Sequence, residues 1–556
     1  MTLRKNDLLW IVPLALVLGA GLSSLQPGNW LIGFASFSFL FLLSFSLFTM
    51  SIRAERSVLR LRASQQPLSP PLRTNPTTGE ERSRSVLAWI IAFTFSLRLI
   101  VGISLYVFLP IYGHEDADDK SGFVFTDAHR RDDEAWGLAS SERPIFDAFS
   151  KKFAYDQYGG LLAFSALVYR YLSPDTHRPL MLILISAIVA ALGIPFLWRA
   201  VHQIFGEKVA WASAWIFALY PESILLGASI MREPYLLTFS AMALYGFVNS
   251  GVQQLAAIPD SKLSDSKVVA RVWLGIGLLG MLVVSPAVAI AHLIIFAGWV
   301  FFANEQRTIS WKAVLLFVAI FLAGLFFLSA SLNRSGEFDA SSPLSVVNDW
   351  LRLAVKWNAY GIERDSGWVQ KLFDEMPQWM HLPFVAVYGI LQPVLPASLI
   401  KPTVLLWKML YTLRALGWYA LLPAMILSFG AGAGFGLGKK RNVILWLALL
   451  TWTWILLAAL RGGGDMWDNP RYRTILFVWQ AILGGVVWVW WREVRPVWFM
   501  RVVACEVAFL LVFTQWYVNR YLHLGVKLEF PVMVALIFGL WFAIVGLGWW
   551  WDRKRV

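Results

Sequence analysis

The sequence predicts an all-α polytopic membrane protein, with about 14 transmembrane helices, interfacial helices and outer loops. Hydrophobic residues make up 58% of the chain and charged residues 15%, whereas an ordinary soluble domain has about 25% charged residues. The apolar residues come in blocks of roughly 20, the length that crosses a hydrocarbon core. Lys and Arg concentrate in alternating loops, so the net charge of +13 indicates orientation in a membrane rather than nucleic-acid binding. The single cysteine, Cys505, excludes an intramolecular disulfide.

The amino-terminal region predicts a membrane hairpin followed by a linker. Apolar runs at 8–22 and 30–50 predict two uncleaved spans in residues 1–50. Residues 51–85 contain seven Arg and three Glu around a Pro/Ser/Thr-rich middle, a composition that does not pack a core. We therefore expect a basic cytoplasmic linker there. The positive-inside rule then places the N-terminus in the cytoplasm and directs the next span, 86–110, outward.

Residues 86–330 are expected to form a catalytic membrane core that carries an acidic outer loop at 111–155. This loop holds ten acidic residues in 45 positions. Eleven further apolar blocks follow it, at 178–198, 209–227, 235–249, 273–284, 287–302, 313–329, 404–429, 443–460, 474–491, 502–518 and 530–551. Basic residues between these blocks place the C-terminus in the cytoplasm as well.

Several segments do not fit simple crossings. Segments 159–172 and 382–399 are short or broken by Pro383, Pro393 and Pro396, so we expect interfacial or re-entrant helices. Segment 273–302 is too short for two full crossings and predicts a shallow hairpin. Residues 331–381, of mixed charge, predict an outer-face loop or small subdomain, and 382–556 the C-terminal transmembrane helices.

The acidic loop contains the main candidates for chemistry. Asp132, Asp133 and Glu134 are consecutive, and in a helix Trp136 lies near the Asp132 and Asp133 face. An apolar wall raises the pKa of a carboxylate, which suits a general base. The same residues also suit a helix N-terminus, where the dipole favours acidic side chains. Asp127 is a second candidate; with His129 it forms only a weak metal signature, so a divalent metal is possible but not favoured.

Two other loops carry charged residues at span boundaries. Arg232 and Glu233 precede Pro234, and they either pair locally or belong to a site, because ionisable groups at membrane depth are costly. Arg471 and Arg473 flank Tyr472 at the mouth of a late span. Two guanidinium groups can bind a phosphate by forked hydrogen bonds, and they can equally reach lipid headgroups.

In their order along the chain, these features resemble the GT-C superfamily of polyprenyl-phosphate-dependent glycosyltransferases, especially the protein O-mannosyltransferase and aminoarabinose-transferase type. The motifs that carry the resemblance are Phe-Ser-Leu-Arg-Leu at 95–99, Asp-Asp-Glu-Ala-Trp-Gly-Leu-Ala at 132–139, Tyr-Gly-Gly-Leu-Leu-Ala-Phe at 158–164, Ile-Phe-Gly-Glu-Lys-Val-Ala at 204–210, Leu-Tyr-Pro-Glu-Ser at 219–223, Met-Arg-Glu-Pro-Tyr-Leu-Leu at 231–237 and Asn-Pro-Arg-Tyr-Arg-Thr at 469–474. They cover roughly residues 86 to 490, and their specificity lies in their order. The chain lacks the family's His-Pro-Pro-type segment at 155–160 and has two extra spans before the core.

The resemblance implies a GT-C-like fold and an inverting sugar transfer at the outer face of a bacterial cytoplasmic membrane. A polyprenyl-phosphate donor would give its sugar to an acceptor hydroxyl on a glycan, lipid or protein. Asp133 or Asp132 would be the general base, and Arg471, Arg473 and Tyr472 would bind the donor phosphate. The remaining substrate-binding candidates are Asp127, Glu134, Arg232 and Glu233. No cofactor is certain beyond the lipid-linked sugar donor.

Three other functions compete with this prediction. A transporter or flippase needs a midplane site that opens to both sides, whereas the charged residues here cluster at one surface. A polysaccharide polymerase or ligase would share the lipid-linked donor and would rely on Arg and His in a large outer loop such as 330–381. A membrane scaffold would have no chemistry at all.

Overall fold

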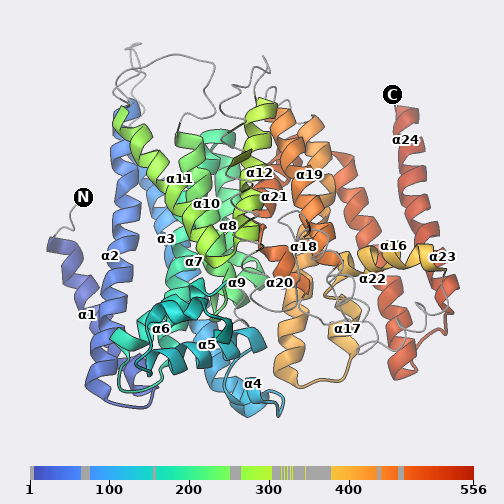
Figure 1. Ribbon diagram of the computed structural model, residues 1–556. Helices are drawn as coiled ribbons and strands as arrows, with labels where there is room; N and C mark the ends of the chain where they lie inside the picture. The colour runs from blue at the N-terminus through green and yellow to red at the C-terminus, as the bar shows by residue number, and fades with distance from the viewer. Residues whose placement is uncertain are drawn as a thin grey trace.

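The computed structural model describes residues 5–63, 76–153, 158–250, 264–303, 377–434, 440–460 and 469–555, with a few single positions between 315 and 345. Every regular element in these residues is a helix (Figure 1). Within these described ranges, ten helices are long and apolar enough to cross a membrane, or up to eleven if a bent pair counts as one span. The predicted helical membrane class is thus confirmed, but the expected total of about 14 spans is not.

The first two helices form the expected hairpin at one side of the bundle. Helix α1 (Lys5–Ser24) packs against α2 (Trp30–Ala63). The next helix along the chain is α3 (Pro76–Tyr112). Both ends of the predicted linker are therefore helical, while residues 64–75 lie outside the described part. Arg, Glu and Leu dominate residues 53–62, and these residue types are good helix formers.

Helix α7 (Pro179–Phe205) is the centre of the amino-terminal half. It packs against α2, α3, α8 (Glu207–Leu219) and α10 (Glu233–Asn249), and 21 of its 27 residues are buried, because its residues are apolar on nearly all sides. Helix α8 bends by 59° into α9 (Pro221–Gly227). The buried Arg98 donates to the carbonyls of Phe217 and Ala218 at this bend, each at 3.2 Å. An ionisable side chain at membrane depth thus compensates the broken helix.

The shallow hairpin expected at 273–302 is wrong. Helix α11 (Ser264–Val284) and helix α12 (Pro286–Ala303) are each long and apolar enough to span a membrane. The difference arises because α11 includes Lys267 and Arg271, which the sequence analysis assigned to a loop. Long basic side chains at a helix end can reach the interface while their stems lie along apolar surface.

The carboxy-terminal half combines long spans with short broken helices. The elements are α16 (Gln378–Leu391), α17 (Leu395–Ile400), α18 (Leu405–Gly434), α19 (Lys440–Ala459), α20 (Asn469–Thr474), α21 (Phe477–Val494), α22 (Val497–Leu522), α23 (Phe530–Phe542), η4 (Ala543–Leu547) and α24 (Gly548–Arg555). Helix α16 is too short for a crossing and lies across the direction of the long helices (Figure 1). The break after it contains the cis peptide Gln392-Pro393. Most of the predicted span 313–329 and of the loop 331–381 lies outside the described residues.

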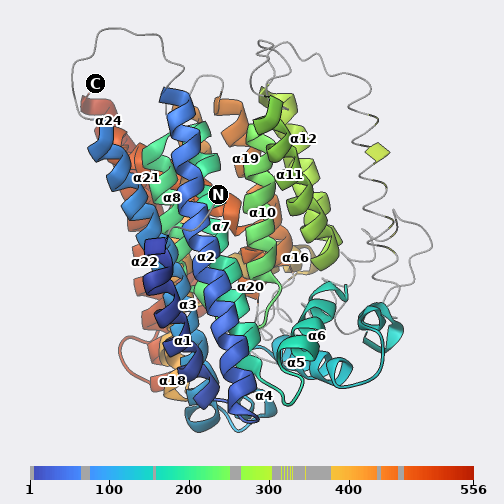
Figure 2. The same cartoon turned by 90° about the vertical axis from the view of Figure 1, so that its left-hand side faces the viewer.

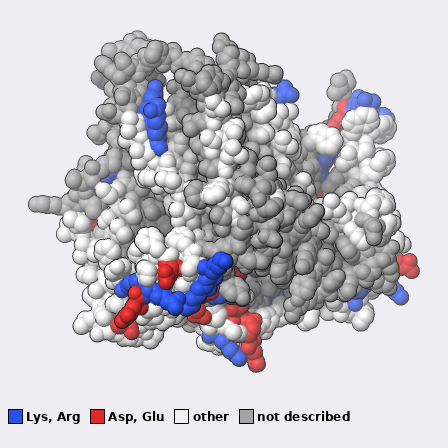
Figure 3. Space-filling view, in the orientation of Figure 1, with Lys and Arg blue, Asp and Glu red and all other residues white. Residues whose placement is uncertain are grey.

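One end of the bundle collects the short elements of the acidic loop. These are α4 (Ala117–Lys120), α5 (Thr126–Ala139), η1 (Ile145–Phe149), η2 (Lys151–Phe153) and α6 (Gly160–Leu172). Figures 1 and 2 show α4, α5 and α6 together at the lower end of the bundle. Charged side chains gather over this end, whereas the described side chains in the middle of the visible face are mostly uncharged (Figure 3). We call it the acidic end; the sequence analysis predicts that it faces outward.

Candidate functional site

An early acidic residue and a late basic residue meet at the acidic end. Arg471 Nη2 donates to Asp127 Oδ2 at 2.6 Å, although the two residues are 344 positions apart. The same nitrogen donates to the Tyr472 hydroxyl at 2.8 Å, and the guanidinium lies 4.8 Å from the centre of the Tyr472 ring. The Arg471 side chain is 9% exposed and the Asp127 side chain 48%. The buried guanidinium is therefore held beside a carboxylate that remains open to solvent.

Further guanidinium groups surround Asp127. The pKa of Asp127 falls to about 2, chiefly because of the charge of Arg471; burial opposes this shift, and the charges of Arg131 and Arg232 lower the pKa by smaller amounts. Arg131 also donates to the Ile230 carbonyl at 3.0 Å. We call Arg131, Arg232 and Arg471 the arginine cluster. Guanidinium groups bind phosphate oxygens by charge-assisted, forked hydrogen bonds.

Arg232 of this cluster and its neighbour Glu233 are both predicted substrate-binding residues. Arg232 Nε is 3.9 Å from Glu233 Oε1, and its guanidinium lies 5.3 Å from the centre of the Tyr158 ring. Glu233 is only 1% exposed. The sequence left open whether these two residues pair locally or belong to a site. The local contact is present, and Arg232 also belongs to the arginine cluster around Asp127.

Asp132 is a buried anchor between elements of the acidic end. It is 0% exposed, accepts a hydrogen bond from the Tyr169 hydroxyl and lies 2.8 Å from His177 Nε2. Burial, and then the charge of Asp132, raise the pKa of Tyr169 well above its ordinary value, so the phenol remains a donor. Trp136 stacks on His177, with ring centres 5.4 Å apart. The aromatic wall expected beside Asp132 is present.

Asp133 is the more accessible of the two predicted bases. Its side chain is 62% exposed and lies 3.4 Å from His129 Nε2. His129 Nδ1 lies 2.8 Å from Asp118, which links α4 to α5. Glu134, the next residue, is partly buried. In the described part of the chain, no group of three His, Cys, Asp or Glu side chains is arranged to hold a metal ion.

Arg473 lies apart from the arginine cluster, in the protein interior. It is 1% exposed, stacks 3.4 Å above the Trp418 ring and donates to the Gln392 carbonyl at 3.1 Å and the Ile390 carbonyl at 3.4 Å. These contacts connect α20 to the break between α16 and α17. Arg471 and Arg473 were both predicted to bind the donor phosphate. Of the two, Arg471 contacts α5, which we call the acidic helix.

Sequence reasoning missed two further side chains that hold the site. Arg414 on α18 forms two hydrogen bonds with Glu222 on α9, at 2.6 and 3.0 Å. Trp407, also on α18, donates to Asp119 at 2.7 Å; burial raises the pKa of Asp119. Ionisable residues inside apolar runs were the available signal, but the sequence does not show which residues become partners.

An apolar groove lies between helices of the carboxy-terminal half. It has a volume of about 520 Å³, and side chains of α16, α18, α19, α22 and α23 line it, including Ile390 and Trp452. The Ile390 carbonyl accepts from Arg473. Trp454, two residues after Trp452, donates to the Tyr472 carbonyl at 2.9 Å. The groove is thus linked through neighbouring residues to Arg471, and its size suits a hydrocarbon ligand.

Fold and site together define a polytopic helical membrane protein with an arginine-rich polar site at one end and an apolar groove between its carboxy-terminal helices. No family model and no curated protein matches the chain. Solved structures of the Archaeoglobus fulgidus oligosaccharyltransferase are similar: one tethered with an acceptor peptide containing the NVT sequon (12% identity, TM-score 0.39), one in complex with an inhibitory peptide and a dolichol-phosphate (14%, 0.36), and the apo form (13%, 0.39). Each comparison covers 82% of this chain and 54–56% of the other. The chain spans about half the length of those proteins.

Proposed function

We propose that this chain is a membrane glycosyltransferase that moves a sugar from a polyprenyl-phosphate donor to an acceptor hydroxyl, with inversion, at the acidic end. The observation that carries the proposal is the contact between Arg471 and Asp127, from opposite ends of the sequence, within a cluster of three guanidinium groups. The acceptor hydroxyl belongs to a glycan, a lipid or a protein. The acidic end faces away from the cytoplasm, and both termini lie inside.

The donor phosphate would bind against Arg471, which Asp127 and Tyr472 hold in place. As the bond between sugar and phosphate breaks, negative charge accumulates on the phosphate. Guanidinium groups that are already oriented stabilise this charge without reorganisation. Arg232 and Arg131 add to the positive potential. Glu233 and Glu134 would contribute to binding the sugar or the acceptor.

The apolar groove supports a lipid-linked donor. Its lining includes Phe384, Val387, Phe513 and Trp541, and a polyprenyl chain would replace membrane lipid against these side chains. The hydrocarbon would thus be held between helices while the phosphate lies at the polar end. This arrangement fixes the position of the donor, and it lowers the entropic cost of reaction with the acceptor.

Asp133 or Asp132 would remove the proton from the acceptor hydroxyl. Asp133 is open to solvent and is supported by His129. Asp132 is enclosed by Tyr169 and His177, so an acceptor reaches it only after this packing opens. Asp127 is a third candidate, but its low pKa makes it a weak proton acceptor while Arg471 is bound to it.

The proposal is tested with purified protein in liposomes that contain a radiolabelled polyprenyl-phosphate sugar. Arg471→Ala is expected to weaken binding of the lipid roughly 10-fold or more, because a charge-assisted contact is lost. Arg492→Ala is the matched control, since this exposed arginine lies in the last turn of helix α21. Wild-type protein that neither binds the lipid nor transfers its sugar to any acceptor would overturn the proposal.

A further inference from the structure

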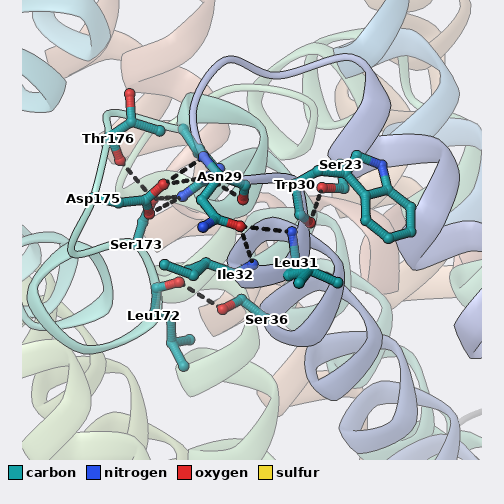
Figure 4. Close-up of polar contacts among 11 residues, drawn as sticks. Ser23, Asn29, Trp30, Leu31, Ile32, Ser36, Leu172, Ser173, Asp175 and Thr176 are labelled. Atoms are coloured by element: carbon teal, nitrogen blue, oxygen red, sulfur yellow. Dashed lines mark hydrogen bonds and ion pairs between the residues drawn. The ribbon is translucent and has the colours of Figure 1, made fainter.

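The turn of the amino-terminal hairpin is bound to the loop between α6 and α7 (Figure 4). The backbone N–H of Asn29 donates to Asp175 Oδ2 at 2.8 Å, and Arg178 Nη2 donates to the Asn29 carbonyl at 2.9 Å. Farther along α2, the Ser36 hydroxyl donates to the Leu172 carbonyl at 2.6 Å. The hairpin therefore contacts loop 173–178 by hydrogen bonds as well as by packing.

This contact is closely fitted. Arg178 is 1% exposed and pairs with both oxygens of Asp175, at 2.5 and 2.7 Å. Gly28 has a φ of +91°, and a Cβ there would lie 2.3 Å from Thr176 Cγ2 and 2.8 Å from Asp175 Oδ2. Only glycine fits this approach without displacing the loop.

The same loop holds the acidic helix from its other side. His177 lies between the residues that bind the hairpin, and its Nε2 is 2.8 Å from Asp132 Oδ2 on α5. Trp136 of α5 stacks on the His177 ring. Six residues of loop thus connect the hairpin turn to the helix that carries Asp127 and Asp133.

We propose that the hairpin turn, residues 25–29, positions the acidic helix α5 through loop 173–178, with Asp175 as the positioning residue. Asp175 touches no reacting group in this scheme; it acts by fixing the loop that holds Asp132. The effect on catalysis depends on the function proposed above, but the effect on the position of α5 does not. A displacement of α5 by about 1 Å would move Asp127 and Asp133 out of register with Arg471.

The position of α5 can be measured directly in the full-length chain. Spin labels at Ser140→Cys, at the exposed end of α5, and at Leu524→Cys, on a distant exposed turn, report their distance distribution in a Cys505→Ala background. Asp175→Ala is expected to broaden or shift this distribution. Asp175→Asn keeps one carbonyl oxygen as an acceptor and should give a smaller change.

Glu493→Gln is the matched control, because it breaks an exposed ion pair with Lys208 at 2.6 Å that lies outside the acidic end. It should leave the distribution unchanged. Opening of the hairpin turn is followed separately by the reactivity of Gln26→Cys, since residue 26 is buried at 9% exposure. If Asp175→Ala exposes residue 26 and leaves the distances to α5 unchanged, the positioning role is overturned.

Sugar transfer gives the second measurement. Asp175→Ala should lower kcat roughly 10- to 100-fold, with a smaller change in KM for the lipid, because Arg471 lies on α20. A purely structural role would instead lower the amount of folded protein and leave kcat of the folded fraction intact. If the wild-type protein transfers no sugar, the proposed function fails, and the spin-label distances still decide whether the hairpin positions α5.

Discussion

The buried ion pair between Glu222 and Arg414 predicts a large stability effect from one substitution. The side chains are 1% and 3% exposed, and they meet through two hydrogen bonds of 2.6 and 3.0 Å. Glu222→Ala would leave the Arg414 guanidinium charged and buried. Removing one partner of such a pair costs about 3 to 5 kcal/mol. We therefore expect a clear loss of thermal stability for purified protein in detergent, measured by tryptophan fluorescence during heating.

Two further variants separate this effect from a general sensitivity to mutation. Glu493→Gln breaks the exposed pair with Lys208 and should change stability by about 0 to 1 kcal/mol. Replacing both Glu222 and Arg414 by Met should recover much of the loss, because apolar side chains of similar volume can substitute for a buried ion pair. Equal melting temperatures for Glu222→Ala and Glu493→Gln would refute the reasoning, and so would a double variant no more stable than the single one.

Three other predictions concern the site. Arg473→Ala should reduce thermal stability more than lipid binding, since Arg473 contacts Trp418 and backbone carbonyls. Arg471→Ala should reduce lipid binding more than thermal stability. Lipid-binding and thermal-melting assays on both variants check this. Ile537→Trp, which places a larger side chain in the groove, should weaken binding of long polyprenyl phosphates more than that of short ones; equal weakening would argue against the groove as the tail site. The pKa of Asp127 is lowered from 3.8 to about 2. Its ion pair with Arg471 is therefore complete above pH 3.8 and is lost as the pH falls toward 2. If lipid binding weakens near pH 6 in the wild-type protein, and equally in Asp127→Asn, the titrating group is not Asp127.

Local patterns predicted most of the fold, because the length of an apolar run is a property of adjacent residues. The short helices α6 and α16 confirm this, since their apolar runs are too short to cross. The start of α11 at Ser264 was missed because Lys267 and Arg271 were assigned to a loop. Charge alone does not mark the end of a helix when long side chains can reach the interface.

The site was only partly predictable. The sequence pointed to the acidic loop and to residues 469–474, and the structure brings Asp127 and Arg471 together. Which carboxylate faces Arg471 depends on how α5 is rotated against its neighbours, and this is set by tertiary contacts. His177 and Arg414 had no local signal, because their partners Asp132 and Glu222 are distant in sequence.

The two faces of α5 bear on which carboxylate could act as the proposed base. Each residue turns a helix by about 100°, so Asp132 and Asp133 lie about 140° and 120° around α5 from Asp127. Asp132 is enclosed on the face toward α6, whereas Asp127 and Asp133 remain exposed. Asp127 lies on the face of α5 that contacts Arg471, and the charge of Arg471 is the main reason that the pKa of Asp127 is low.

A donor phosphate that draws Arg471 away from Asp127 would remove this cause and add a negative charge nearby, and both changes raise the pKa of Asp127. Donor binding would then turn a weak proton acceptor into an effective one. If Asp127 is the base, the lower pKa in the pH profile of kcat should exceed that of kcat/KM, and Asp127→Asn should abolish transfer while Asp133→Asn retains it. Loss of transfer in Asp133→Asn alone would instead assign the base to the exposed face of α5 and leave Asp127 to hold Arg471.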